Sequence, residues 1–207
     1  MHVSSTRKPR SLLNSRLDVS WPSILAIGLV AVMMALISLA SVPQTVGWLG
    51  VGLAELMLAI AVIDWRHFII PDRLNATAFV LGLVHAWWQD PQDPVVALAT
   101  ALARGAVLAA IFWALRLGYQ RMRGREGLGF GDVKLAGAAG MWLGWPVLPL
   151  AVELAAVSAL IFYGLRQVIQ KEPLSATNRL PFGAFLALAV WLTWVFENTS
   201  EPLLCCP

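Results

Sequence analysis

Two aspartates stand in apolar parts of this sequence, where an acidic side chain is expensive. Asp64 ends the run "LAIAVID", and Asp132 lies in "GFGDVKLAG", between a basic segment and another apolar run. A carboxylate within a membrane is costly, so such acids are candidates for function. Two carboxylates that share one pocket with water can hydrolyse a peptide bond, one as general base and the other as general acid. The question is whether the chain brings them together.

The composition is that of a membrane protein. The chain has 207 residues, of which 58% are hydrophobic and 13% charged, and its mean hydropathy is +0.71. Soluble domains are about half apolar and about a quarter charged, so we expect an all-α, multi-pass protein with the lipid bilayer as its surroundings. The net charge of +3 comes from a few basic clusters, which gives no reason to expect nucleic acid as a partner. Oligomeric state is left open.

Seven segments are apolar enough to be candidate membrane helices, given that a span needs about 20 residues. They cover residues 21–41, 46–64, 74–89, 95–117, 131–145, 147–168 and 181–197. We therefore predict an N-terminal tail at 1–20, one transmembrane domain at 21–197 and a short C-terminal tail at 198–207.

The distribution of Lys and Arg supports this count. Basic residues of one or both types occur in the N-terminal tail and then in every second connection, while the other connections and the C-terminal tail hold none. By the positive-inside rule, the N-terminus lies in the cytoplasm and the C-terminus outside, in the inner membrane of the cell. A cleaved signal peptide is the alternative for the first segment, but no A-x-A-like site closes it.

Helix length predicts that the two aspartates lie at similar depth. If Trp145 marks an outer end, Asp132 lies about 20 Å further in, and Asp64 lies about 24 Å from Trp48 at the outer end of its own helix. Gly129 and Gly131 permit an irregular backbone before Asp132, which is tolerated at membrane depth only beside protein or a water-filled cavity. These distances favour a shared pocket near the inner face.

A simpler interpretation has equal weight on spacing alone. In it, Asp132 caps the helix that it begins, and Asp64 ends its helix in interfacial water. Neither side chain then needs the other. Neither the two adjacent cysteines, Cys205 and Cys206, nor the histidines form a metal-binding motif, so no metal or cofactor is expected.

Three blocks of sequence resemble the type IV prepilin peptidases, membrane aspartyl proteases of the GxGD class. They are "DWRHFIIPD" at 64–72, "GFGDVKLAGAAGMWLG" at 129–144 and "LPFGAFLALA" at 180–189. The resemblance implies that Asp64 and Asp132 are the catalytic pair and that Gly129 and Gly131 shape the active-site loop. It also implies cleavage of prepilin leader peptides at the cytoplasmic face, without metal or cofactor.

The chain differs from the large members of that family. Those carry a cytoplasmic insert with two CxxC pairs after the first helix, which is associated with N-methylation, whereas this chain has a short connection without cysteine. Methyl transfer is therefore not expected, and the chain is similar to the compact peptidases of tight-adherence (Flp) pili.

Several other residues allow more than one interpretation. Lys134 extends to the inner interface or influences the aspartate pair. Pro181, Phe182 and Gly183 form a substrate-binding edge or simply begin a closely packed helix. Asp72, where the family accepts Asp or Asn, is assigned to helix capping.

Arg104 falls within an apolar segment, where arginine is costly. Glu55 and Glu153 are predicted at comparable depth, so we expect an ion pair with one of them. This pair is expected to be structural.

Two rival functions stay open. One is a GxGD protease that acts on pseudopilins or archaellin-like precursors. The other, from a different class, is a proton-coupled transporter or an inactive membrane scaffold, which predicts that Asn at positions 64 and 132 leaves function intact.

Overall fold

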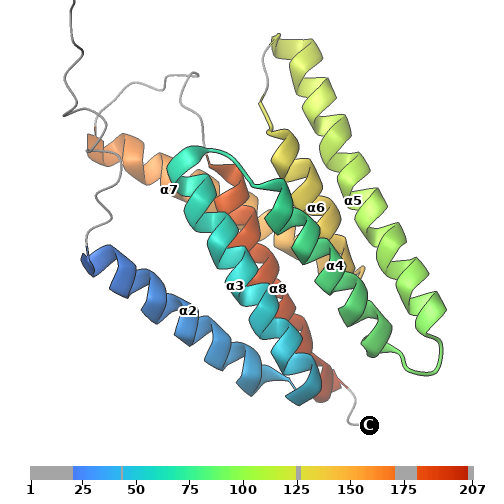
Figure 1. Ribbon diagram of the computed structural model, residues 1–207. Helices are drawn as coiled ribbons and strands as arrows, with labels where there is room; N and C mark the ends of the chain where they lie inside the picture. Colours follow the sequence, from blue (N-terminus) through green and yellow to red (C-terminus); the bar gives the residue numbers. More distant parts are fainter. Residues whose placement is uncertain (1–20, 43, 125–126, 171–180, 205–207) are drawn as a thin grey trace, which may run out of the picture.

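The computed structural model describes residues 21–42, 44–124, 127–170 and 181–204. These residues form seven α-helices joined by short connections (Figure 1). The helices are α2 (Trp21–Ser41), α3 (Gln44–His67), α4 (Asp72–Gln89), α5 (Pro94–Arg123), α6 (Phe130–Trp142), α7 (Leu148–Gln170) and α8 (Phe182–Leu204). The predicted all-α fold is confirmed, and the tail at 1–20 and both cysteines lie outside the described residues.

Five of these helices are long and apolar enough to cross a membrane, namely α2, α3, α5, α7 and α8. The expectation of seven spans therefore holds for seven helices but not for seven full-length apolar spans. α6 has 13 residues, about 20 Å of helix against a hydrocarbon core of about 30 Å. α4 begins with Asp72, Arg73 and, one turn in, Asn75, which lower its hydropathy. α6 contains Asp132 in its first turn, and α4 begins eight residues after Asp64.

Helix ends differ from the predicted bounds where polar residues remain helical. α5 runs on to Arg123, beyond the predicted end of its segment at residue 117, and Gly124 ends it in the left-handed conformation. α8 continues to Leu204, into the segment predicted as a tail. Helices that leave a bilayer need not stop at its surface, because water satisfies their outer side chains.

The short helix α6 lies at the centre of the bundle, against α4, α5 and α8 (Figure 1). Small side chains make this possible, because Ala and Gly let neighbouring backbones approach closely. Gly140 shows how closely: a Cβ there would lie 2.5 Å from the Cα of Gly105 on α5. α6 is thus held in place by backbone contact, which fixes the position of its first turn.

Replacing Gly140 by Ala is expected to destabilise the protein by about 1–3 kcal/mol through overpacking. The added methyl would meet the backbone of α5, which cannot move aside as a flexible side chain would. Thermal unfolding in detergent measures the effect. Gly118→Ala, where a Cβ would meet nothing within 4 Å, is the matched control and should unfold like the wild type.

α3 and α8 pack side by side in opposite directions. Gly50 in the second turn of α3 lies against the Trp194 ring in the middle of α8, where a Cβ would collide with that ring. At the other end, Asp64 contacts Ala184 in the first turn of α8. The end of α3 is thereby brought to the beginning of α8, the arrangement that positions the first aspartate.

α2 and α7 lie at the periphery. α2 packs on α3 and to a lesser extent on α8, and α7 packs on α8. In Figure 1, α2 diverges from α3 towards its own N-terminal end, and α7 crosses the bundle at a steep angle. Their large apolar side chains are widely exposed, for example Leu29 and Leu160, as expected of helices that face lipid.

Candidate active site

Asp64 is buried in the last turns of α3, with 5% of its surface exposed. Its Oδ2 accepts a hydrogen bond of 2.8 Å from the backbone N–H of Ala184. Ala184 lies in the first turn of α8, where N–H groups have no helical partner and the helix dipole favours negative charge. The start of α8 therefore binds and orients the Asp64 carboxylate.

Asp132 is the third residue of α6 and is also buried, at 8% exposed. Its Oδ2 accepts a hydrogen bond of 3.1 Å from the N–H of Gly129, the residue that precedes the helix. An acidic side chain that reaches back in this way is half of a capping box. The interpretation of Asp132 as a helix cap is thus correct for Oδ2. The other oxygen, Oδ1, takes no part in this capping hydrogen bond.

The remaining oxygen of Asp132 faces Asp64 across Gly183. A Cβ built on Gly183 would lie 2.9 Å from Asp132 Oδ1 and 2.9 Å from Asp64 Oδ2, so these oxygens are at most twice that distance apart. The structure therefore brings together the two carboxylates that the sequence singled out, called the dyad below. The interpretation of Asp64 as a residue in interfacial water is wrong, because its carboxylate is buried against α8.

The residues around Gly183 complete one wall of the dyad. Pro181 is buried just before α8, and its carbonyl also accepts from the N–H of Ala184 at 3.2 Å. The Phe182 ring packs near the Phe112 ring of α5, with centroids 6.2 Å apart. Of the predicted substrate-binding edge, Gly183 is the residue next to both carboxylates, while Phe182 packs against α5.

The glycine loop, residues 127–131, leads into the first residues of α6 and borders Asp132. Gly131 lies against Ile70, where a Cβ would be 3.0 Å from the Ile70 Cβ, and a Cβ on Gly129 would lie 3.1 Å from Asp132 Oδ2. Arg116 on α5 donates from Nη1 to the Leu128 carbonyl at 3.1 Å. Glycine at 129 and 131 is thus needed for close approach to Asp132 and Ile70.

Lys134 forms an ion pair with Asp72, which corrects the expectation that Asp72 caps a helix. Lys134 Nζ lies 2.6 Å from Asp72 Oδ1 and 5.0 Å from the centre of the Phe130 ring. Asp72 is the first residue of α4, and the residue before the helix is Pro71, with no side-chain cap. Asp72 therefore does not cap α4 but ties its start to α6, while Lys134 is directed to Asp72.

Breaking this pair is expected to change activity little. The Asp72 side chain is 75% exposed, and exposed ion pairs contribute about 0–1 kcal/mol. In an initial-rate assay, Asp72→Asn and Lys134→Met should each keep the peptide cleavage expected from the sequence within about fivefold of the wild type, the factor to which about 1 kcal/mol corresponds. A loss of a hundredfold or more in Asp72→Asn would instead place Asp72 in the chemistry.

The expected ion pair of Arg104 with Glu55 or Glu153 is wrong. Both glutamates are exposed on their helices. Arg104 is buried, donates from Nε to the Gly140 carbonyl at 3.1 Å, and lies near enough to Glu197 to feel its charge. Position along the sequence placed Arg104 and the two glutamates at similar depth, but the helical phase of Glu55 and Glu153 turns their side chains away from the core.

Glu197 and His85 belong to a polar cluster that the sequence did not reveal. Glu197 accepts from the N–H of Gly144 at 3.0 Å. His85 stacks on the Trp142 ring with centroids 5.0 Å apart and accepts from Trp194 Nε1 at 3.5 Å. The contacts join α4, α6 and α8, so this cluster is structural.

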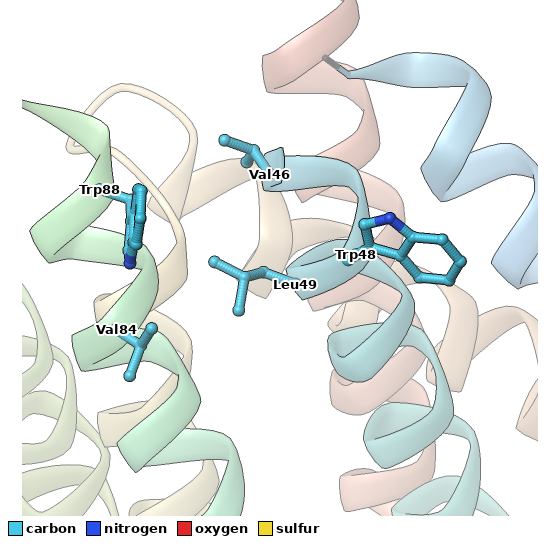
Figure 2. A pocket seen from close by; sticks show the side chains of 5 residues that line it. All are labelled: Val46, Trp48, Leu49, Val84 and Trp88. Carbon is cyan, nitrogen blue, oxygen red and sulfur yellow. The ribbon is translucent and has the colours of Figure 1, made fainter. Parts of the chain in front are cut away.

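An apolar hollow of about 350 Å³ lies between the first turns of α3 and the last turns of α4 (Figure 2). It is lined by Val46, Trp48, Leu49, Val84 and Trp88. Figure 2 shows Trp88 and Val84 on one helix facing Val46 and Leu49 on the other. Asp64 stands 16 residues beyond Trp48, about 24 Å along α3, so this hollow is separate from the dyad.

The chemistry that this arrangement permits is hydrolysis by paired carboxylates. Two buried carboxylates this close repel each other when both are charged, which favours a state in which they share one proton. That state supplies one base and one acid at the same place. Among the described residues, no group of three or more His, Cys, Asp or Glu is placed to hold a metal ion.

The chain matches the type IV leader peptidase family over residues 51–164. It is 36% identical over 140 residues to leader peptidase HopD of Salmonella typhimurium, covering 68% of this chain and 87% of that protein. No solved structure matches the chain significantly. Because the family model covers more than half of the sequence, the chain belongs to this family.

Longer relatives show the same similarity over part of their length. The chain is 31% identical over 175 residues to the prepilin leader peptidase/N-methyltransferase of Aeromonas salmonicida, with 83% of this chain and 58% of that protein covered. For the protein of the same name from Escherichia coli, identity is 32% over 144 residues, with 67% and 61% covered. The chain thus spans about three fifths of these relatives.

Proposed function

We propose that this protein is a membrane aspartyl endopeptidase that removes leader peptides from type IV or Flp-type prepilins, with Asp64 and Asp132 as its catalytic pair. The observation that carries the proposal is the meeting of two buried carboxylates across Gly183, in a member of the leader peptidase family. The relatives' names connect them with prepilin leaders, and the dyad supplies the chemistry such cleavage needs.

In the proposed mechanism the dyad begins with one carboxylate ionised and the other protonated. The ionised carboxylate takes a proton from water while the water oxygen attacks the scissile carbonyl carbon. The protonated carboxyl donates its proton to the carbonyl oxygen. Collapse of the tetrahedral intermediate breaks the C–N bond. The departing amine takes a proton from the carboxyl that received it from water, and a hydroxyl of the intermediate returns a proton to the other carboxylate as the carbonyl re-forms, which restores the dyad. The Ala184 N–H on Asp64 and the Gly129 N–H on Asp132 keep one oxygen of each carboxylate fixed throughout.

The proposed orientation places the dyad near the cytoplasmic face of the inner membrane. It rests on the alternation of Lys and Arg between connections. The end of α3 and the starts of α6 and α8 then face the cytoplasm, where a leader preceding an apolar span would be exposed. Peptide cleavage alone is proposed, without N-methyl transfer.

Co-expression with a tagged prepilin tests the proposal. We expect the wild-type chain to shorten a Flp-type prepilin, with a single new N-terminus identified by mass spectrometry. A pseudopilin and an archaellin-like precursor are assayed in parallel, so that the substrate cut fastest defines the class. Cells without the protein are the control, and absence of cleavage of all three precursors by well-expressed protein would refute the function.

A further inference from the structure

Asn75 is a buried amide beside the dyad that the mechanism has not used. It lies in the first turn of α4, with 4% of its surface exposed. Its Nδ2 donates to the carbonyl of Gly131 at 3.3 Å. That carbonyl belongs to the same peptide unit as the N–H of Asp132, so Asn75 is one peptide group away from an aspartate of the dyad.

The orientation of the Asn75 amide is fixed by this contact. Only the NH₂ group can face a carbonyl oxygen favourably, because two carbonyl oxygens repel each other. The amide oxygen Oδ1 therefore points away from Gly131. This atom is buried and accepts no hydrogen bond from any residue that the structure describes.

A buried acceptor without a partner costs about 1–3 kcal/mol. A leucine of similar size would avoid this cost, so the amide is expensive unless it gains a partner in the working enzyme. Among the described residues, neither the dyad nor Lys134 donates a hydrogen bond to Oδ1, and Lys134 pairs with Asp72. The substrate is a partner that can bring such a donor to the site.

A peptide strand brings such donors with it. Backbone N–H groups that leave water at membrane depth must find acceptors in the protein. A peptide bound across the dyad would pass the start of α6, beside which Asn75 holds the Gly131 carbonyl, and one of its N–H groups could meet Oδ1 there. The same side chain would then hold both the loop, through Nδ2, and the substrate, through Oδ1.

We infer that Asn75 binds the substrate backbone: its Oδ1 accepts a hydrogen bond from a peptide N–H near the scissile bond, while its Nδ2 positions the Gly131–Asp132 peptide unit. This inference rests on the proposed function. It assigns to α4 a share of the active site in addition to those of α3, α6 and α8.

The test is a double-mutant cycle that combines loss of the Asn75 amide in the enzyme with loss of one backbone N–H in the substrate. Purified wild type and Asn75→Leu are assayed on synthetic prepilin peptides in which an ester replaces one amide at a time around the cut site. We expect Asn75→Leu to lower kcat/KM about tenfold to a hundredfold. One ester position should slow the wild type but cause no further loss in Asn75→Leu, because the partner is already gone.

Two controls separate this role from a structural one. Asn75→Thr keeps a donor and an acceptor and should recover part of the lost kcat/KM. Thr193→Val removes another buried oxygen without a described partner, nine residues beyond Ala184 on α8, and should match the wild type. Thermal unfolding of each variant shows whether it is folded. If Asn75→Leu does not fold, the test is made with Asn75→Thr alone.

The outcomes are distinct. Wild-type activity in Asn75→Leu, or equal ester effects in wild type and variant at every position, would overturn the inference while cleavage itself stands. Equal losses of activity and unfolding temperature in Asn75→Leu and Asn75→Thr would assign Asn75 to structure instead. Absence of cleavage by the wild type would remove the proposed function and this inference together.

Discussion

Asn in place of either Asp64 or Asp132 is expected to abolish trimming, with kcat at least about a thousandfold lower. An amide has nearly the shape of a carboxylate but cannot take a proton from water, and it is a poor donor of one. The hydrogen bonds from the N–H groups of Ala184 and Gly129 each need only an oxygen, so both variants should keep the local fold. Initial rates on a tagged prepilin measure the effect.

Asp72→Asn is the matched control for this prediction. It makes the same chemical change in an acid that follows Asp64 by eight residues but is exposed and paired with Lys134. It should remain active while both dyad variants fail at equal accumulation in the membrane. Trimming that survives in Asp64→Asn or Asp132→Asn would contradict the aspartyl mechanism and favour a scaffold or transporter.

The two aspartates could be singled out from the sequence because their cost is visible there, although spacing alone gave the capping interpretation equal weight and the family resemblance selected them as a pair. An acid at the edge of an apolar segment stands out, and helix rise alone brought Asp64 and Asp132 to similar depth. Two interpretations of Asp132 seemed to compete, as a cap or as an active-site acid. The structure shows that the cap uses Oδ2 while Oδ1 faces Asp64, a division between two atoms that no residue pattern contains.

Contacts that depend on helical phase and crossing could not be found in this way. Depth predicted Glu55 or Glu153 as the partner of Arg104, but depth does not say which way a side chain turns. Arg104 instead meets the Gly140 carbonyl, because small residues on α6 let its backbone come close. Asn75 was missed for a related reason, since its only signal was a polar residue in the first turn of a helix.

Gly183→Ala is expected to inactivate the protein nearly as fully as loss of an aspartate. The added methyl would stand 2.9 Å from an oxygen of each carboxylate and 2.5 Å from Ile70 Cδ1, where it would displace the water and the scissile carbonyl from between the two acids. Because misplacement by about 1 Å can cost about a hundredfold in rate, we expect kcat/KM to fall by that factor or more.

The comparison with Gly164→Ala makes this prediction specific. A Cβ on Gly164 of α7 would meet nothing within 4 Å, so this variant undergoes the same chemical change and should cleave prepilin at the wild-type rate. Thermal unfolding in detergent distinguishes a blocked dyad from a displaced α8, since only the latter lowers the unfolding temperature strongly. Full activity in Gly183→Ala would mean that the carboxylates do not act across this glycine, and the dyad geometry proposed for catalysis would fail with it.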